Sequence, residues 1–367
     1  MGILRLLLAV AVVMGHTGVR GMVGGIFAVE LFYIISGYLI SFVLVEAKTY
    51  KRLRDFYLNR SLRLFPLYWL VAILALTGQL VFWATSKESS FLSAYSQMPG
   101  LAAFFVGASN ITLLGQDQVM FMAVHGSELQ WTGNFQDSEV PLWHGLLVPQ
   151  AWTLGVELAF YIVAPVVLRT KRRLLAVFFL SLLLRAAFIY WGFGMVDPWR
   201  YRFFPTELCV FLLGAISHQF VRPKIDQISE QLKKRLGNIV VVLGLVFVVF
   251  FSAIPTHQYL KGALLFIFVI GTLPLLFDFQ NRSKFDNFVG QLSYPVYIWH
   301  MLVISCIGII PVNLDHGTLE FFIVTLVGSL VLSWLSLRFI DKPVQKLRAR
   351  FRNRDFRVAP NGLAPLA

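Results

Sequence analysis

Ten stretches of about 20 mostly apolar residues run through this 367-residue chain, and each is long enough to cross a bilayer as a helix. Because hydrophobic residues make up 57% of the chain and charged residues only 14%, no soluble fold of this length could bury its apolar surface. The sequence therefore predicts an all-α, polytopic membrane protein and excludes a cytosolic enzyme and a disordered chain. The predicted spans are 2–19, 24–45, 64–85, 149–168, 174–192, 203–220, 238–254, 261–278, 288–310 and 318–338.

The distribution of basic residues between the connections predicts the orientation of the chain. With the N-terminus in the cytoplasm, 26 of the 32 Lys and Arg residues fall on the cytoplasmic side and five on the opposite side. Cytoplasmic connections retain Lys and Arg, so this bias supports an even number of spans with both termini in the cytoplasm. It also explains the net charge of +13 without a nucleic-acid partner.

Two segments lie outside the predicted bundle. We expect residues 1–340 to form one transmembrane domain with a long external connection at 86–148, which contains an apolar stretch at 101–114. This connection is either a loop with an interfacial helix or a lid or platform for an acceptor. The tail at 341–367 is basic and contains proline, and we expect it to be disordered against anionic lipid.

Ionisable residues inside the spans are candidate functional groups, because lipid solvates charge poorly. Arg5 and His16 share one face of the first span and lie about 16 Å apart along its axis. Glu30 in the second span is expected at a depth similar to that of His16. A carboxylate beside an imidazole would fix its tautomer and raise its basicity.

Paired arginines mark the cytoplasmic mouth of the predicted bundle. Arg60 and Arg63 are three residues apart and therefore lie on the same side of a helix where the third span begins. Such a pair suits the bidentate binding of phosphate groups. The simpler interpretation is that both residues only contribute to the cytoplasmic charge bias.

Polar residues at mid-depth and on the external side complete the candidate set. Ser293, Tyr297 and His300 fall on one face of the ninth span, while Trp152 and Glu157 lie near the external start of the fourth. Together with the arginines, these groups indicate a phosphate-bearing donor that arrives from the cytoplasm and an acceptor that arrives from outside.

Six short motifs occur in order over residues 2–343. They are Arg5-x10-His16, Val29-Glu30-Leu31-Phe32-Tyr33-Ile34-Ile35-Ser36-Gly37-Tyr38, Arg60-x-x-Arg63, Trp152-Thr153-Leu154-x-x-Glu157, Ser293-Tyr294-x-x-Tyr297-x-x-His300 and Asp341-Lys342-Pro343. This series resembles the acyltransferase 3 family of integral membrane O-acyltransferases. The departures from the family pattern are conservative: Glu30 stands for Asp, Thr153 for Ser and Asp341 for Glu.

The resemblance implies an enzyme of the bacterial inner membrane that moves an acyl group from cytoplasmic acyl-CoA to a sugar hydroxyl on the far side. The donor implied is acetyl-CoA or another acyl-CoA, without a metal. The acceptor implied is a cell-surface or lipid-linked glycan such as lipopolysaccharide O-antigen or exopolysaccharide. Because no hydrolase-like domain follows the tenth span, the chain resembles the stand-alone members that modify surface polysaccharides.

The resemblance also implies roles for individual residues. His16 is expected to act as general base or as a transient acyl carrier, with Glu30 orienting it. The remaining roles are CoA phosphate binding by Arg5, Arg60 and Arg63, oxyanion stabilisation by Tyr297, Ser293 and His300, and acceptor binding by Trp152 and Glu157. The alternative function is a transporter or flippase of an acylated or glycosylated lipid, which would show inverted halves that this sequence lacks. The oligomeric state is not indicated.

Overall fold

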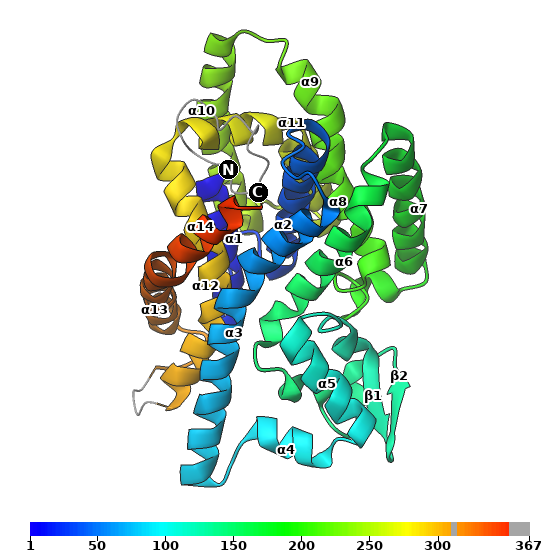
Figure 1. Ribbon diagram of the computed structural model, residues 1–367, viewed down its shortest axis with the longest axis vertical. Coiled ribbons are helices and arrows are strands. Elements are labelled where there is room, and N and C mark those ends of the chain that lie inside the picture. Colours follow the sequence, from blue (N-terminus) through cyan, green and yellow to red (C-terminus); the bar gives the residue numbers. More distant parts are fainter. Residues whose placement is uncertain (310–313, 352–367) are drawn as a thin grey trace.

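The computed structural model describes residues 1–309 and 314–351, and this part of the chain is a helical bundle with one short hairpin (Figure 1). Nine of its helices are long and apolar enough to cross a membrane, which confirms the predicted all-α polytopic class. The first predicted span is the shorter α1. The helices are α1 (Gly2–His16), α2 (Gly25–Ser41), α3 (Leu53–Ser86), α4 (Ser90–Gln97), α5 (Gly100–Thr112), α6 (Trp152–Val167), α7 (Lys171–Tyr190), α8 (Phe204–Ile216), α9 (Arg222–Ile225), α10 (Glu230–Phe250), α11 (Gln258–Arg282), α12 (Lys284–Ile309), α13 (Leu319–Ser336) and α14 (Lys342–Ala349).

Helix α1 lies inside the bundle, where it packs mainly against α2 and α12. Its apolar side chains face neighbours on several sides, and Leu8, Ala9 and Val13 are completely buried. A helix that is apolar all round is suited to such a position. Helix α7 is the opposite case, because large side chains such as Leu180 and Leu183 are exposed on its outer surface, as expected for a helix that faces lipid.

Two glycines allow α2 and α8 to pack with their backbones in contact. A Cβ atom on Gly37 would collide with the backbone of Phe211, and one on Gly214 would collide with the backbone of Ile34. Small residues at such crossings are typical of membrane helices, because close approach increases van der Waals contact. Gly37 and Gly214 therefore serve the packing of α2 against α8.

The connection at 87–148 folds into a small unit at the opposite end of the molecule from α9 (Figure 1). It contains α4, α5 and the antiparallel pair β1 (Met122–His125) and β2 (Glu128–Trp131). Side chains from Ala94 to Leu146 form a hydrophobic cluster of their own in this unit. The predicted apolar stretch at 101–114 therefore corresponds to α5. We call this end of the molecule the loop end, and the end with α9 the basic end.

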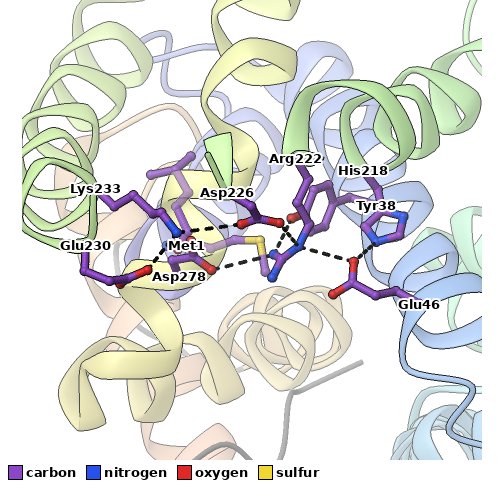
Figure 2. Close-up of polar contacts among 10 residues, drawn as sticks. Met1, Tyr38, Glu46, His218, Arg222, Asp226, Glu230, Lys233 and Asp278 are labelled. Atoms are coloured by element: carbon purple, nitrogen blue, oxygen red, sulfur yellow. Dashed lines mark hydrogen bonds and ion pairs between the residues drawn. The ribbon is translucent and has the colours of Figure 1, made fainter. Parts of the chain in front are cut away.

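A network of charged and polar side chains ties four long helices together at the basic end (Figure 2). Arg222 forms ion pairs with Glu46 at 3.3 Å and with Asp226 and Asp278 at 3.6 Å. His218 bonds Glu46 through Nε2 at 2.8 Å and Ser41 through Nδ1 at 2.9 Å. Glu46 lies in the turn that continues α2, His218 in the turn that continues α8, and Asp278 near the end of α11. Lys233 adds α10 by binding Glu230 and Asp226.

The prediction that the chain is disordered from residue 341 is wrong for its first part, because Lys342–Ala349 form α14. Arg348 of this helix is buried and donates from Nε and Nη2 to Asn59 Oδ1 on α3, at 3.2 and 3.0 Å. Asn59 in turn donates to the Arg348 carbonyl at 3.0 Å. These contacts with α3 hold a short, strongly charged helix that its own composition would not stabilise. Residues 352–367 lie outside the described residues.

The orientation can be checked by cysteine accessibility. In a Cys306→Ser background, we expect an impermeant thiol reagent to label Ser127→Cys, on the exposed turn between β1 and β2, in intact cells. Lys224→Cys in α9 should react only after the membrane is opened, because the charge bias places the basic end in the cytoplasm. Labelling with the sites reversed would contradict the predicted orientation.

Candidate functional site

Three arginines from two helices converge on a cavity of about 90 Å³ inside the bundle. Arg5 comes from α1, and Arg60 and Arg63 come from α3, so the structure brings together the residues predicted to bind the donor. A second cavity of about 40 Å³ is also lined by Arg5 and Arg63 and extends to α14. The two cavities thus share Arg5 and Arg63, and the second one extends from these side chains to α14.

Two of the arginines have buried N–H groups that the protein does not satisfy. Arg5 is 6% exposed and Arg60 is 2% exposed. Among the residues that the structure describes, none accepts a hydrogen bond from Arg5 Nη1 or from Arg60 Nε and Nη2. The Arg60 guanidinium lies instead 5.6 Å from the Phe56 ring centroid and 5.8 Å from that of Tyr161. Buried donors without acceptors are costly, so these groups are suited to an anionic ligand.

Glu157 lines the same cavity as the arginines, which differs from its predicted place on the acceptor side. Its Oε1 accepts hydrogen bonds from Ser36 at 2.7 Å and Tyr161 at 2.5 Å. The cause is helical geometry, because Trp152 and Glu157 are separated by about 140° around the axis of α6 and by more than one turn. The predicted grouping of these two residues is therefore wrong.

His16 and His300 form a contact pair at the loop end of α1. His300 is completely buried, and its Nδ1 lies 2.6 Å from the Tyr297 carbonyl, which can only accept. His300 Nε2 is therefore left as an acceptor, and it lies 3.1 Å from His16 Nδ1. His16 Nδ1 is also 3.1 Å from the Val12 carbonyl, so it carries the proton. In the neutral pair, this arrangement leaves Nε2 of the exposed His16 as an unprotonated base.

Glu30 does not have the role predicted for it. It forms an ion pair with Arg185 of α7, and Arg185 also binds Glu207 of α8 at 2.6 Å. The carboxylate is thus engaged with a guanidinium, while the ring nitrogen that faces His16 belongs to His300. Similar depth in the membrane placed Glu30 near His16 in the prediction, but depth does not determine which way a helix turns its side chains.

The three side chains predicted to stabilise an oxyanion all lie on α12, but their protons are already engaged. Ser293 donates to the Gly290 carbonyl at 2.8 Å and Tyr297 to the Gln150 carbonyl at 2.6 Å. His300 donates from Nδ1 to the Tyr297 carbonyl. Each hydroxyl has one proton, so neither can donate to an oxyanion without breaking a short internal bond. The assignment of oxyanion donors must therefore be revised.

Arg202 is a residue of this region that the sequence reasoning counted only as an external charge. Its guanidinium lies 4.2 Å from the centroid of Trp152, the aromatic residue predicted to bind the acceptor. Trp152 itself is 7% exposed. Arg202 lies in an irregular connection, where no helical periodicity indicates which way its side chain points. Its contact with Trp152 is between residues 50 positions apart, so the sequence alone gives no signal for it.

Buried arginines near one end of a helical membrane domain and a histidine pair near the other are the arrangement expected of a membrane-bound group-transfer enzyme. The chain belongs to the acyltransferase 3 family, whose sequence profile, described as an acyltransferase domain, matches residues 1–338. This confirms the resemblance on which the residue roles were based and argues against the transporter alternative.

Relatives with assigned names support the same class. The chain is 24% identical to the peptidoglycan O-acetyltransferase OatA of Listeria monocytogenes, over 94% of this chain and 55% of that protein. It is also 24% identical to a putative O-acetyltransferase of Staphylococcus aureus, over 94% of this chain and 56% of that protein. An uncharacterized protein of Aquifex aeolicus is 27% identical over 58% of this chain and 93% of its own length. The chain thus spans just over half the length of the named relatives. No solved structure matches it.

Proposed function

We propose that this protein transfers an acyl group, most simply acetyl, from cytoplasmic acyl-CoA to a hydroxyl of a glycan outside the inner membrane. The observation that carries this proposal is the pair of buried, unsatisfied guanidiniums of Arg5 and Arg60 at a cavity inside the bundle. A phosphate-bearing donor supplies the acceptors that these N–H groups lack. Arg63 lines the same cavity and adds a third positive charge.

The donor would enter through the second cavity, which extends from the arginines to α14. Its phosphates would bind the three arginines, and its pantetheine arm would extend along α1 towards the loop end. Arg5 and His16 are about 16 Å apart along α1, so an extended arm is needed to carry the thioester to the histidine pair. Tyr297 lines the arginine cavity, and its ring centroid is 5.7 Å from that of His300.

His16 would act as the general base. Its Nε2 takes the proton of the sugar hydroxyl as the sugar oxygen attacks the thioester carbon, and the same proton then protonates the departing CoA sulfur. His300 is a positioning residue in this reaction, because it holds the Nδ1–H of His16 and so selects the tautomer with a basic Nε2. A transient acyl-histidine is the other route, and it would use the same nitrogen.

The acceptor is a surface or periplasmic glycan in this proposal. The name of the Listeria relative refers to peptidoglycan, while lipopolysaccharide O-antigen and exopolysaccharide are the acceptors inferred from the sequence. Mass spectrometry of each glycan from cells with and without the protein tests the proposal. We expect one glycan to lose an O-acyl mass, and the size of that mass identifies acetyl or succinyl. Glycans that are identical in the two strains would contradict the function.

The donor site has a direct test. Replacing both Arg60 and Arg63 with Gln should weaken acyl-CoA binding by at least about tenfold, because each charge-assisted hydrogen bond is worth roughly 1.5–3 kcal/mol. Isothermal titration with the purified protein measures this change. The matched control is Arg52→Gln with Arg54→Gln, which removes two exposed arginines of the same segment and should leave affinity unchanged. Normal acyl-CoA binding by the Arg60/Arg63 variant would show that the two arginines do not bind the donor and only contribute to the cytoplasmic charge bias.

A further inference from the structure

The site as described has a base but no free donor for the negative charge that forms on the thioester oxygen. Ser293, Tyr297 and His300 all donate to backbone carbonyls. Stabilising a tetrahedral oxyanion requires a donor that is already in place, and this interaction is commonly the largest single contribution to the rate. Another residue near His16 must therefore supply it if the proposed function is correct.

Arg202 is held rigidly in the connection before α8. Its Nε donates to Asp197 Oδ1 at 2.6 Å, and its Nη2 donates to Asp197 Oδ2 at 3.0 Å and to the Tyr201 hydroxyl at 2.9 Å. The Arg202 Cζ lies 4.2 Å from the centroid of the Trp152 ring, in cation–π contact with it. A bidentate carboxylate and an aromatic face together fix both the position and the plane of the group.

The remaining nitrogen of Arg202 is Nη1. It is buried, and none of the residues that the structure describes accepts a hydrogen bond from it. The contacts that anchor the connection use only Nε and Nη2, so a purely structural arginine would not require this third nitrogen. A buried charged donor without an acceptor is costly, and an acceptor that forms during a reaction would relieve that cost.

A chain of contacts links Arg202 to the proposed base. Trp152 beneath Arg202 is followed by Thr153, whose hydroxyl lies 2.8 Å from that of Tyr297. The ring centroids of Tyr297 and His300 are 5.7 Å apart, and those of His300 and His16 are 4.9 Å apart. Two members of this chain of contacts, Thr153 and Tyr297, also line the arginine cavity.

We propose that Arg202 is a catalytic residue whose Nη1 donates to the thioester oxygen. As the sugar oxygen attacks, its proton passes to His16 Nε2, and the carbonyl π electrons move to the oxygen that Arg202 holds. When the carbonyl reforms, the C–S bond breaks and the sulfur leaves with its electron pair. His16 then returns the proton to that sulfur, which gives the O-acyl glycan and free CoA. This inference rests on the proposed function.

The alternative role for Arg202 is acceptor binding, and turnover without an acceptor separates the two. The probe is acetyl-CoA with the purified full-length protein, with water as acceptor in one assay and membranes that contain the glycan in the other. If Arg202 stabilises the oxyanion, Arg202→Gln should lose roughly 10²–10³-fold in kcat in both assays, with the KM for acetyl-CoA unchanged. A variant that keeps hydrolysis and loses only transfer would assign Arg202 to the acceptor and overturn the proposal.

Three further variants keep the test decisive if Arg202→Gln does not fold. Asp197→Asn weakens the anchor of the connection but keeps Nη1, so it should retain at least a tenth of the wild-type kcat. An equal loss in Asp197→Asn and Arg202→Lys would show that only the anchor matters. Arg200→Gln removes another arginine of the same connection and should stay within about threefold of wild type. If the wild-type protein consumes no acetyl-CoA in either assay, the proposed function has failed rather than the role of Arg202.

Discussion

Replacing His16 with Gln should give a protein that inserts and binds acyl-CoA but transfers acyl groups roughly 10²–10⁴-fold more slowly. The reason lies in the two nitrogens of the ring. A glutamine amide can replace the Nδ1–H that faces Val12 and His300, but it has no basic nitrogen to replace Nε2. The variant therefore separates the structural contact of this residue from its proposed chemistry. The measurement is release of CoA in the presence of the glycan acceptor.

Two nearby histidines provide the controls for this experiment. His316 Nε2 lies 2.9 Å from the backbone carbonyl of His16 and has no proposed role in the reaction. His316→Gln should therefore keep nearly full activity. His300→Leu leaves the base but removes one of the two acceptors of its Nδ1–H, and its loss should be smaller than that of His16→Gln. Activity of His16→Gln within about threefold of wild type would exclude the histidine as a base.

The sequence predicted those parts of the protein that depend on local composition. A run of apolar residues is sufficient to identify a membrane helix, so nine of the predicted spans match long apolar helices. The convergence of Arg5 with Arg60 and Arg63 also followed from local features, since depth and helical phase were read for each segment separately. The family motifs then associated these segments with one reaction.

The parts that the sequence did not predict depend on how helices turn relative to one another. For Glu30 and Glu157 the sequence predicted the depth in the membrane but not the neighbouring side chains. These depend on how each helix is rotated about its axis, which is set by packing such as that of Gly37 against Phe211. Helix α14 depends on the contact of Arg348 with Asn59, nearly 290 residues away in the chain. Arg202 lies in an irregular connection, where no periodic pattern assigns a direction to a side chain.

Replacing Arg185 with Met should have an effect as large as that of His16→Gln, but on stability rather than on catalysis. Arg185 forms an ion cluster with Glu30 and Glu207. Glu30 is 3% exposed, Glu207 is completely buried, and both bind the same guanidinium. Arg185→Met would leave two carboxylates facing each other without a counter-ion. We expect a loss of about 3 kcal/mol in the free energy of unfolding, at the lower end of the range for broken buried pairs because Arg185 is itself 21% exposed. Thermal unfolding in detergent measures the change.

The matched control for this prediction removes all three charges together. In a variant with Arg185→Met, Glu30→Gln and Glu207→Gln, no buried charge is left unpaired, so most of the lost stability should return. Such a recovery would show that the single substitution acts through the two abandoned carboxylates and not through lost packing of the long arginine side chain. If Arg185→Met unfolds at the wild-type temperature, the carboxylates do not depend on Arg185 as counter-ion. If the triple variant is no more stable than the single one, Arg185 stabilises the protein through the packing of its long side chain against α2 and α8 and not through its charge.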